Sequence, residues 1–159
     1  MRYSSELLNC GTQQEKPEKS GNCGQIYSEG GNVPSLDEWL REAKANSDAG
    51  NVGMYLTHCG VVRETARARV REGDVGAQSV KGMYFSYDAE RLQDAIEETR
   101  RMDGIYYVRA WLNEGHLKVG DDIMRVLIGG DIRPHVMDAL QFLVGRIKTK
   151  CVKEREDFG

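Results

Sequence analysis

Four cationic side chains stand where predicted secondary-structure elements begin or end. Arg63 closes a strand-like stretch, Arg133 lies in the first turn of a predicted helix, and Lys148 and Lys153 lie near the end of that helix. Guanidinium and ammonium groups in such positions can bind an anionic ligand such as a phosphate. Cations in the last helical turn also complement the helix dipole without any ligand. The residues alone leave both interpretations open.

The helix that carries three of these cations is predicted over residues 131–153. Its apolar face repeats with helical spacing through Val136, Ala139, Leu140, Leu143, Val144 and Ile147. Asp131 is a good N-cap, and Pro134 falls in the first turn, where a missing amide proton costs little. Lys148 lies at the border of the apolar face. The aliphatic part of its side chain can therefore pack against apolar residues while its amine reaches a cleft.

The rest of the chain predicts further helices and several strands. Ser35 and Glu38 form a capping box for a short amphipathic helix. Asp88 caps another helix, which runs to about Met102. Its inward positions are Leu92, Ala95, Ile96 and Thr99. Strands are expected at 52–63, which should be buried, and at 77–87, 105–112 and 123–130, with a turn-rich link at 113–122. This order predicts an α+β fold with an antiparallel or mixed sheet and three main helices.

The segment 64–77 is rich in arginine, with Arg67, Arg69 and Arg71 followed by glycines. A strand would place these three side chains on one side, whereas a helix would align Arg63, Arg67 and Arg71. One interpretation is a solvated basic loop. The other is a mobile rim that attracts an anionic substrate or an acidic partner.

Composition predicts one domain of ordinary size. The chain has 159 residues, 30% of them charged, and a net charge of −3, which gives no general support to nucleic-acid binding. No apolar run approaches the roughly 20 residues that span a bilayer. Residues 1–34 are polar and lack a secretory signal, so we expect a flexible leader, a domain over 35–159 and a cytoplasmic location.

The four cysteines are widely scattered and form neither a CxxC pair nor a zinc pattern. They are Cys10, Cys23, Cys59 and Cys151. Ordinary reduced thiols are expected, with a redox or metal role of Cys10 and Cys23 as the alternative.

Four stretches, in order along the chain, resemble one protein family. They are residues 49–63, GHLKVGDDIMRVLI at 115–128, GDIR with the following QF at 130–142, and IKTK with VKERE at 147–156. On these stretches the chain from about Ser35 to Glu156 resembles the large, catalytic subunit of molybdopterin synthase. Residues 1–34 lie outside the resemblance.

The resemblance implies a specific reaction. Such proteins are homodimers of an α/β-hammerhead subunit, and each protomer binds a small ubiquitin-like sulfur carrier with a Gly-Gly thiocarboxylate tail. Two carrier-borne sulfurs are transferred to cyclic pyranopterin monophosphate, which produces the dithiolene of molybdopterin. The family enzyme needs no metal or redox cofactor.

The resemblance also implies roles for the four cations. Arg63 matches the strand-end arginine of the family and is expected to hold the cyclic phosphate. Arg133 matches an arginine contributed across the dimer interface. Lys148 matches the essential helix lysine, which can stabilise developing negative charge or move a proton. Lys153 is matched to the second family lysine, as an anion ligand.

This chain departs from the family pattern at several positions. Ile132 stands where the family usually has histidine, and we hypothesise that His135, one helical turn later, supplies the missing imidazole; the alternative is a plain surface histidine. Only TKCV separates Lys148 from Lys153, two residues fewer than usual and without the family's Pro and Trp.

Two strand positions also depart. An aromatic of the first strand is His58 here, which we expect to be a packed core residue, and a family arginine aligns with Asn113. The departures keep a rival hypothesis open, namely a non-catalytic homologue that binds the carrier or a phosphate ligand without turnover. A dimeric phosphate-binding protein unrelated to sulfur transfer is a third possibility.

Overall fold

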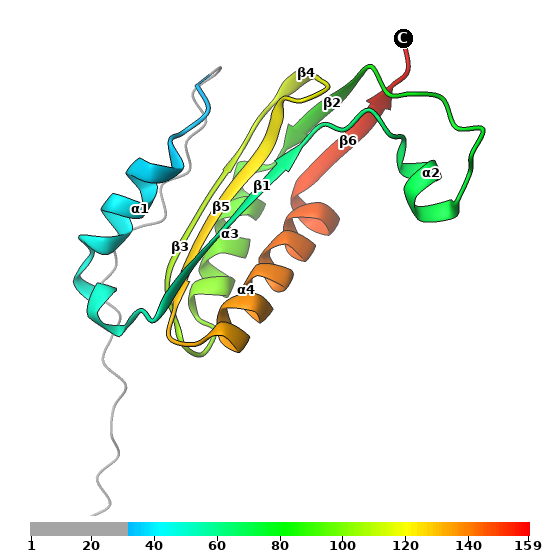
Figure 1. The fold of residues 1–159 in the computed structure, drawn as a ribbon. Helices are drawn as coiled ribbons and strands as arrows, with labels where there is room; N and C mark the ends of the chain where they lie inside the picture. Colours follow the sequence, from blue (N-terminus) through cyan, green and yellow to red (C-terminus); the bar gives the residue numbers. More distant parts are fainter. Residues whose placement is uncertain (1–31) are drawn as a thin grey trace, which may run out of the picture.

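A computed structural model of the chain describes residues 32–159, which contain both helices and strands (Figure 1). In chain order they are α1 (Leu36–Lys44), the 3₁₀ helix η1 (Ser47–Asn51), β1 (Met54–Val61), α2 (Arg67–Glu72), β2 (Gly82–Tyr87), α3 (Ala89–Arg100), β3 (Ile105–Leu112), β4 (Gly115–Lys118), β5 (Asp122–Gly130), α4 (Arg133–Arg146), the π-helical turn η2 (Ile147–Cys151) and β6 (Val152–Asp157).

The strands form two three-stranded sheets with the orders β1-β5-β3 and β4-β2-β6. Every pairing is antiparallel, so the predicted α+β class with an antiparallel sheet is confirmed. Helices α3 and α4 cover one face of the first sheet and α1 covers the other (Figure 1). The expected buried strand at 52–63 is β1, but it is an edge strand and several of its side chains are exposed, because β5 flanks it on one side only.

The main core lies between the first sheet and helices α3 and α4. All four predicted inward residues of α3 are buried, and the hydroxyl of Thr99 donates to the Ala95 carbonyl, which satisfies its one polar group. In α4, Val136, Ala139 and Leu143 are buried, as is Ile147 just beyond its end. Each large aliphatic side chain buried in this way contributes about 1.5–3 kcal/mol.

Helix α1 is held on the opposite face of the sheet by one aromatic and ionic cluster. The Ser35 side chain accepts from the Glu38 amide, as the predicted capping box requires. Trp39 is buried against the guanidinium of Arg109, whose carbon lies 4.7 Å from the ring centroid, and Arg109 also pairs with Glu42. A nearly fully buried cation thus gains a carboxylate and a π face, which offset its desolvation.

The prediction of one helix over 131–153 is wrong at both ends. Its N-cap is Ile132 and not Asp131, although Pro134 does lie in the first turn. The α-helix ends at Arg146, the π turn follows, and the last residues form β6, which pairs with β2. Tertiary strand pairing overrides the helical pattern there. The 113–122 link likewise contains β4, a short strand that also pairs with β2.

The three predicted main helices correspond to α1, α3 and α4, and α2 adds a short fourth. The predicted leader falls mostly on residues 1–31, and Cys10 and Cys23 also lie outside the described residues. No helix within residues 32–159 combines the length and apolar character that crossing a bilayer requires.

Candidate functional site

The ends of β1 and α4 lie at the same end of the molecule. Strand β1 starts beside the end of β5, with Met54 paired to Gly130, and runs antiparallel to it. Helix α4 leaves the end of β5 and returns over the sheet, so it runs in the direction of β1 (Figure 1). The topology therefore places Arg63, just after β1, and Lys148, just after α4, toward one end.

The π turn η2 holds Lys148 in a fixed backbone. Ile147 and Cys151 are buried and anchor the turn, while the residues between them are exposed. Three carbonyl groups at this end of the helix have donors: the Thr149 hydroxyl donates to Gly145 at 2.8 Å, the Arg91 guanidinium to Lys150 at 3.0 Å and the Asp88 amide to Cys151 at 2.8 Å. Single π turns are frequent at functional sites. Helix α3 thus braces the turn that presents Lys148.

His58 is predicted to be a packed core residue, but the structure leaves it only partly buried. It is half-buried on β1, on the side shared with Met54 and Leu56, which pack against the main core. Burial lowers the pKa of His58, and the Lys148 ammonium lowers it further. The expected core histidine is therefore a titratable group within electrostatic reach of Lys148. The sequence signal for this position is that His58 falls on the same side of the strand as the apolar residues Met54 and Leu56.

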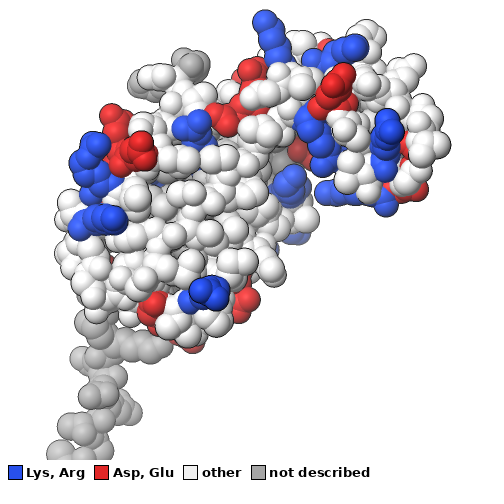
Figure 2. Space-filling view, viewed as in Figure 1, with Lys and Arg blue, Asp and Glu red and all other residues white. Residues whose placement is uncertain are grey.

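Arg63 is exposed, and its Nε donates to the Thr65 carbonyl at 2.9 Å. In the basic segment beyond it, Arg67–Glu72 form helix α2, so these arginines take the helical and not the strand arrangement. Arg67 is tied down, because its guanidinium pairs with Glu154 and its amide donates to Glu156 at 2.8 Å. Basic side chains gather around α2 and the strand ends beside it, whereas the middle of the same face is largely uncharged (Figure 2).

Lys153 lies on β6 opposite Ser86 of β2, on the exposed side of the second sheet. It lines an open groove of about 360 Å³ together with Tyr84 and His116, among others, and Lys148 is not part of that lining. Tyr84 is stacked on His116 and covered by the Arg155 guanidinium at 4.4 Å. The structure therefore puts Lys153 in different surroundings from Lys148.

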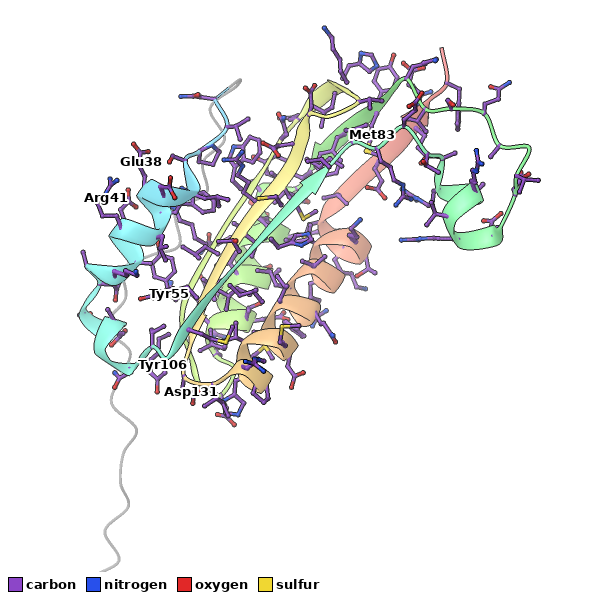
Figure 3. The ribbon with its side chains drawn as sticks, in the orientation of Figure 1. Glu38, Arg41, Tyr55, Met83, Tyr106 and Asp131 are labelled. Atoms are coloured by element: carbon purple, nitrogen blue, oxygen red, sulfur yellow. The ribbon has the colours of Figure 1, made fainter. Side chains whose placement is uncertain are left out.

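Arg133 and His135 lie at the opposite end of α4. His135 Nδ1 lies 2.7 Å from the Asp131 carboxylate, which also accepts from the Ile132 amide at 2.6 Å. The hydrogen bond from His135 is the main reason that the pKa of Asp131 lies below its ordinary value. Asp131 sits where the chain enters α4 (Figure 3). This pair leaves Nε2 of His135 as the ring nitrogen available to a ligand.

One chain thus forms two separate groups of predicted site residues. Arg63 and Lys148 lie toward one end of α4, and exposed Arg133 lies with His135 at the other. Asn113 lies between β3 and β4 and has a structural role, because its side-chain amide donates to the Asp122 carbonyl at the start of β5. Within the described part of the chain, no three His, Cys, Asp or Glu side chains are grouped as a metal site.

Comparison with known proteins identifies the fold. A family model described as MoaE protein matches residues 34–150. The structure of molybdopterin synthase from Staphylococcus aureus is 17% identical with a TM-score of 0.62, covering 84% of this chain and 90% of that chain. Molybdopterin cofactor biosynthesis protein E from Burkholderia multivorans is 15% identical with a TM-score of 0.60, covering 86% and 90%.

A third structure is a complex of subunits 1 and 2 of molybdopterin-converting factor from Helicobacter pylori. It is 13% identical with a TM-score of 0.54, and the match covers 77% of this chain and 78% of that chain. A comparison with curated proteins gives no match.

Fold and site together define an α+β protein that presents a lysine on a braced π turn, within electrostatic reach of a strand histidine. The chain belongs to the MoaE protein family, which gives it a role in molybdopterin synthesis. The family resemblance seen in the residues is confirmed.

Proposed function

We propose that this protein is the large, catalytic subunit of a molybdopterin synthase. In this role it transfers sulfur from a thiocarboxylated ubiquitin-like carrier to cyclic pyranopterin monophosphate and makes the dithiolene. Family membership supports the role in molybdopterin synthesis, and the two-subunit Helicobacter pylori complex supports a small partner protein.

The observation that carries the proposal is the placement of Lys148. Its turn is held by buried anchors and by hydrogen bonds from α3, and its ammonium acts on His58 of β1 at the end of the molecule that also carries Arg63. The carrier tail and the cyclic phosphate are both anions. Lys148 stabilises negative charge that develops at the reacting carbonyl, and Arg63 binds the phosphate through paired hydrogen bonds.

The proposed site is completed by a second protomer. Helix α4 separates Arg133 and His135 from Lys148 in one chain, so a partner protomer would bring its own Arg133 and His135 to the phosphate. The free amides at the start of α4 add to the attraction for an anion. The homodimer is thus part of the proposal, together with the docking of one carrier on each protomer.

The alternative is a homologue that binds the carrier or a phosphate ligand without turnover. The position of Lys153 favours it, because this lysine lines the Tyr84–His116 groove and Lys148 does not. Ile132 favours it as well, since an exposed apolar side chain stands where the family has an imidazole.

One reconstitution separates these functions. The purified protein is mixed with a thiocarboxylated carrier ending in Gly-Gly and with cyclic pyranopterin monophosphate, and the dithiolene product is measured. The same carrier with an ordinary carboxylate is the control. Product that depends on the thiocarboxylate supports the synthase, whereas carrier binding without product supports the alternative, and neither binding nor product contradicts both.

A further inference from the structure

His58 is positioned to do chemistry and not only to pack. Its partner on β5 is Val126, which is fully buried, so the imidazole ring lies next to an apolar part of the sheet. Its Nε2 lies 4.0 Å from the point where a Cβ of Gly60 would be. The ring therefore leans along β1 toward the end of the strand that precedes Arg63, and Gly60 places no side chain over that nitrogen.

The charge that faces His58 comes from one direction. On its own side of the sheet, β5 presents the apolar Met124 and Val126, and the charged group that acts on the ring is the Lys148 ammonium of η2. The other two histidines are engaged elsewhere, His116 with Asp157 and His135 with Asp131. The lysine of the proposed site is thus within electrostatic reach of His58.

We propose that His58 is the general base of the sulfur-transfer site, with Lys148 as the cation that stabilises the charge developing in the same step. This inference rests on the proposed function. The step starts once the thiocarboxylate sulfur has replaced an oxygen substituent on the substrate carbon, which leaves with the electron pair of its carbon–oxygen bond. A thioester then joins the carrier to the substrate. The oxygen of a water molecule then bonds to the thioester carbonyl carbon, and the carbon–sulfur bond to the carrier breaks.

Protons and electrons balance in this step. His58 takes one proton of the water, and the other goes to the departing sulfur, which keeps the electron pair of the broken bond. The carrier leaves with a carboxylate and the substrate keeps a thiol. Lys148 stabilises the negative charge that develops on the carbonyl oxygen.

The surroundings suit the two residues to these opposite roles. Burial and the ammonium both lower the pKa of His58, so its imidazole is neutral and able to accept a proton at neutral pH. Lys148 is exposed on η2, where its side chain can approach the carbonyl oxygen. A neutral base together with a cation that stabilises the developing negative charge suits such a step.

The first test measures the pair without any reaction. The His58 signal in the NMR spectrum of histidine-labelled protein is assigned as the one lost in His58→Phe, and its titration is followed. The His58 pKa should lie below 6.5 and rise in Lys148→Met, while Lys150→Met, two residues away on the same turn, leaves it unchanged. A His58 pKa that does not respond to Lys148→Met overturns the pairing.

The second test uses single-turnover sulfur transfer against pH, with the thiocarboxylated carrier and cyclic pyranopterin monophosphate. His58→Phe and His58→Gln should each lower the rate at pH 7 by about 100-fold or more. They should also remove the fall in rate that the wild type shows as acid protonates the imidazole. An unchanged rate, or an acidic limb that survives in both variants, overturns the base role.

The two tests distinguish the possible failures. If the wild-type protein transfers no sulfur, the proposed function fails while the NMR titration still decides the His58–Lys148 pair. If the wild type is active and the pair titrates as expected but His58→Phe is fully active, the inference alone fails. Thermal melting of both His58 variants verifies that they fold.

Discussion

Arg133 lies at the start of α4 and Lys148 lies on the turn η2 that follows its end, about 20 Å away along the helix axis at 1.5 Å per residue. The two side chains cannot meet in one protomer. If both serve one reaction, the site must be shared between two copies of the chain.

Subunit mixing tests this arrangement. Arg133→Ala and Lys148→Ala are each expected to be inactive, but a mixture after subunit exchange should regain about a quarter of the wild-type activity, because half of the dimers combine both variants and carry one intact site. The measurement is dithiolene formation before and after exchange. A mixture that stays inactive while exchange is verified would place both residues in the same protomer's site or outside it.

Lys148→Ala should abolish product formation while the protein stays folded. The side chain is exposed on η2, so its removal should change the free energy of unfolding by less than about 0.5 kcal/mol. The matched control is Lys150→Ala, because Lys150 is exposed on the same turn and bonds to Arg91 through its backbone carbonyl only. Wild-type activity in Lys148→Ala would remove this lysine from the mechanism.

Gly104→Ala should destabilise the junction that positions His135. Gly104 has φ of +73°, and a Cβ there would lie 2.3 Å from both the Asp131 carboxylate oxygen and His135 Nδ1. The left-handed backbone costs about 1–3 kcal/mol with a side chain, and the clash adds to it.

Gly73→Ala is the control for Gly104→Ala. Gly73 has φ of +72°, and nothing lies near the added Cβ, so this variant carries the backbone cost alone. Urea unfolding of the two variants isolates the steric part of the loss. Equal losses in both would show that the Asp131–His135 pair moves aside freely.

The Asp131–His135 pair should make stability depend on pH in the acid range. Because hydrogen bonding lowers the pKa of Asp131 in the folded state, its stabilisation is present above the ordinary value of 3.8 and disappears as pH falls through the folded value. Asp131→Asn should therefore be less stable than wild type at pH 6, with the difference closing below pH 3.8. Unfolding curves across this range that keep a constant difference would exclude the linkage.

Local signals explain the elements that were predicted well. In α3, the Asp88 cap, the inward positions and the DG at its end are all coded within one short stretch, and the predicted inward residues are those found buried. Strand β3 matches its predicted range, residues 105–112, because its apolar and β-branched residues have no competing helical period.

Local sequence signals do not predict where α4 ends. Its helical pattern continues past Arg146, yet Val152–Asp157 pairs with β2, some 70 residues earlier, and β4 exists only because the same strand offers its other edge. Long-range pairing of this kind leaves little trace in a single short stretch. Lys153 is therefore predicted on a helix but lies on strand β6.

The sequence by itself determined the α+β class, the three main helices, most of the strands and the family, because caps, periodicity and motif order are local or additive properties of the chain. Only the tertiary structure decided that His58 comes within electrostatic reach of Lys148 and that Arg133 lies at the other end of α4. These relationships depend on the direction in which α4 crosses the sheet and on the π turn at its end. They join residues that are distant along the chain through the packing of a shared core.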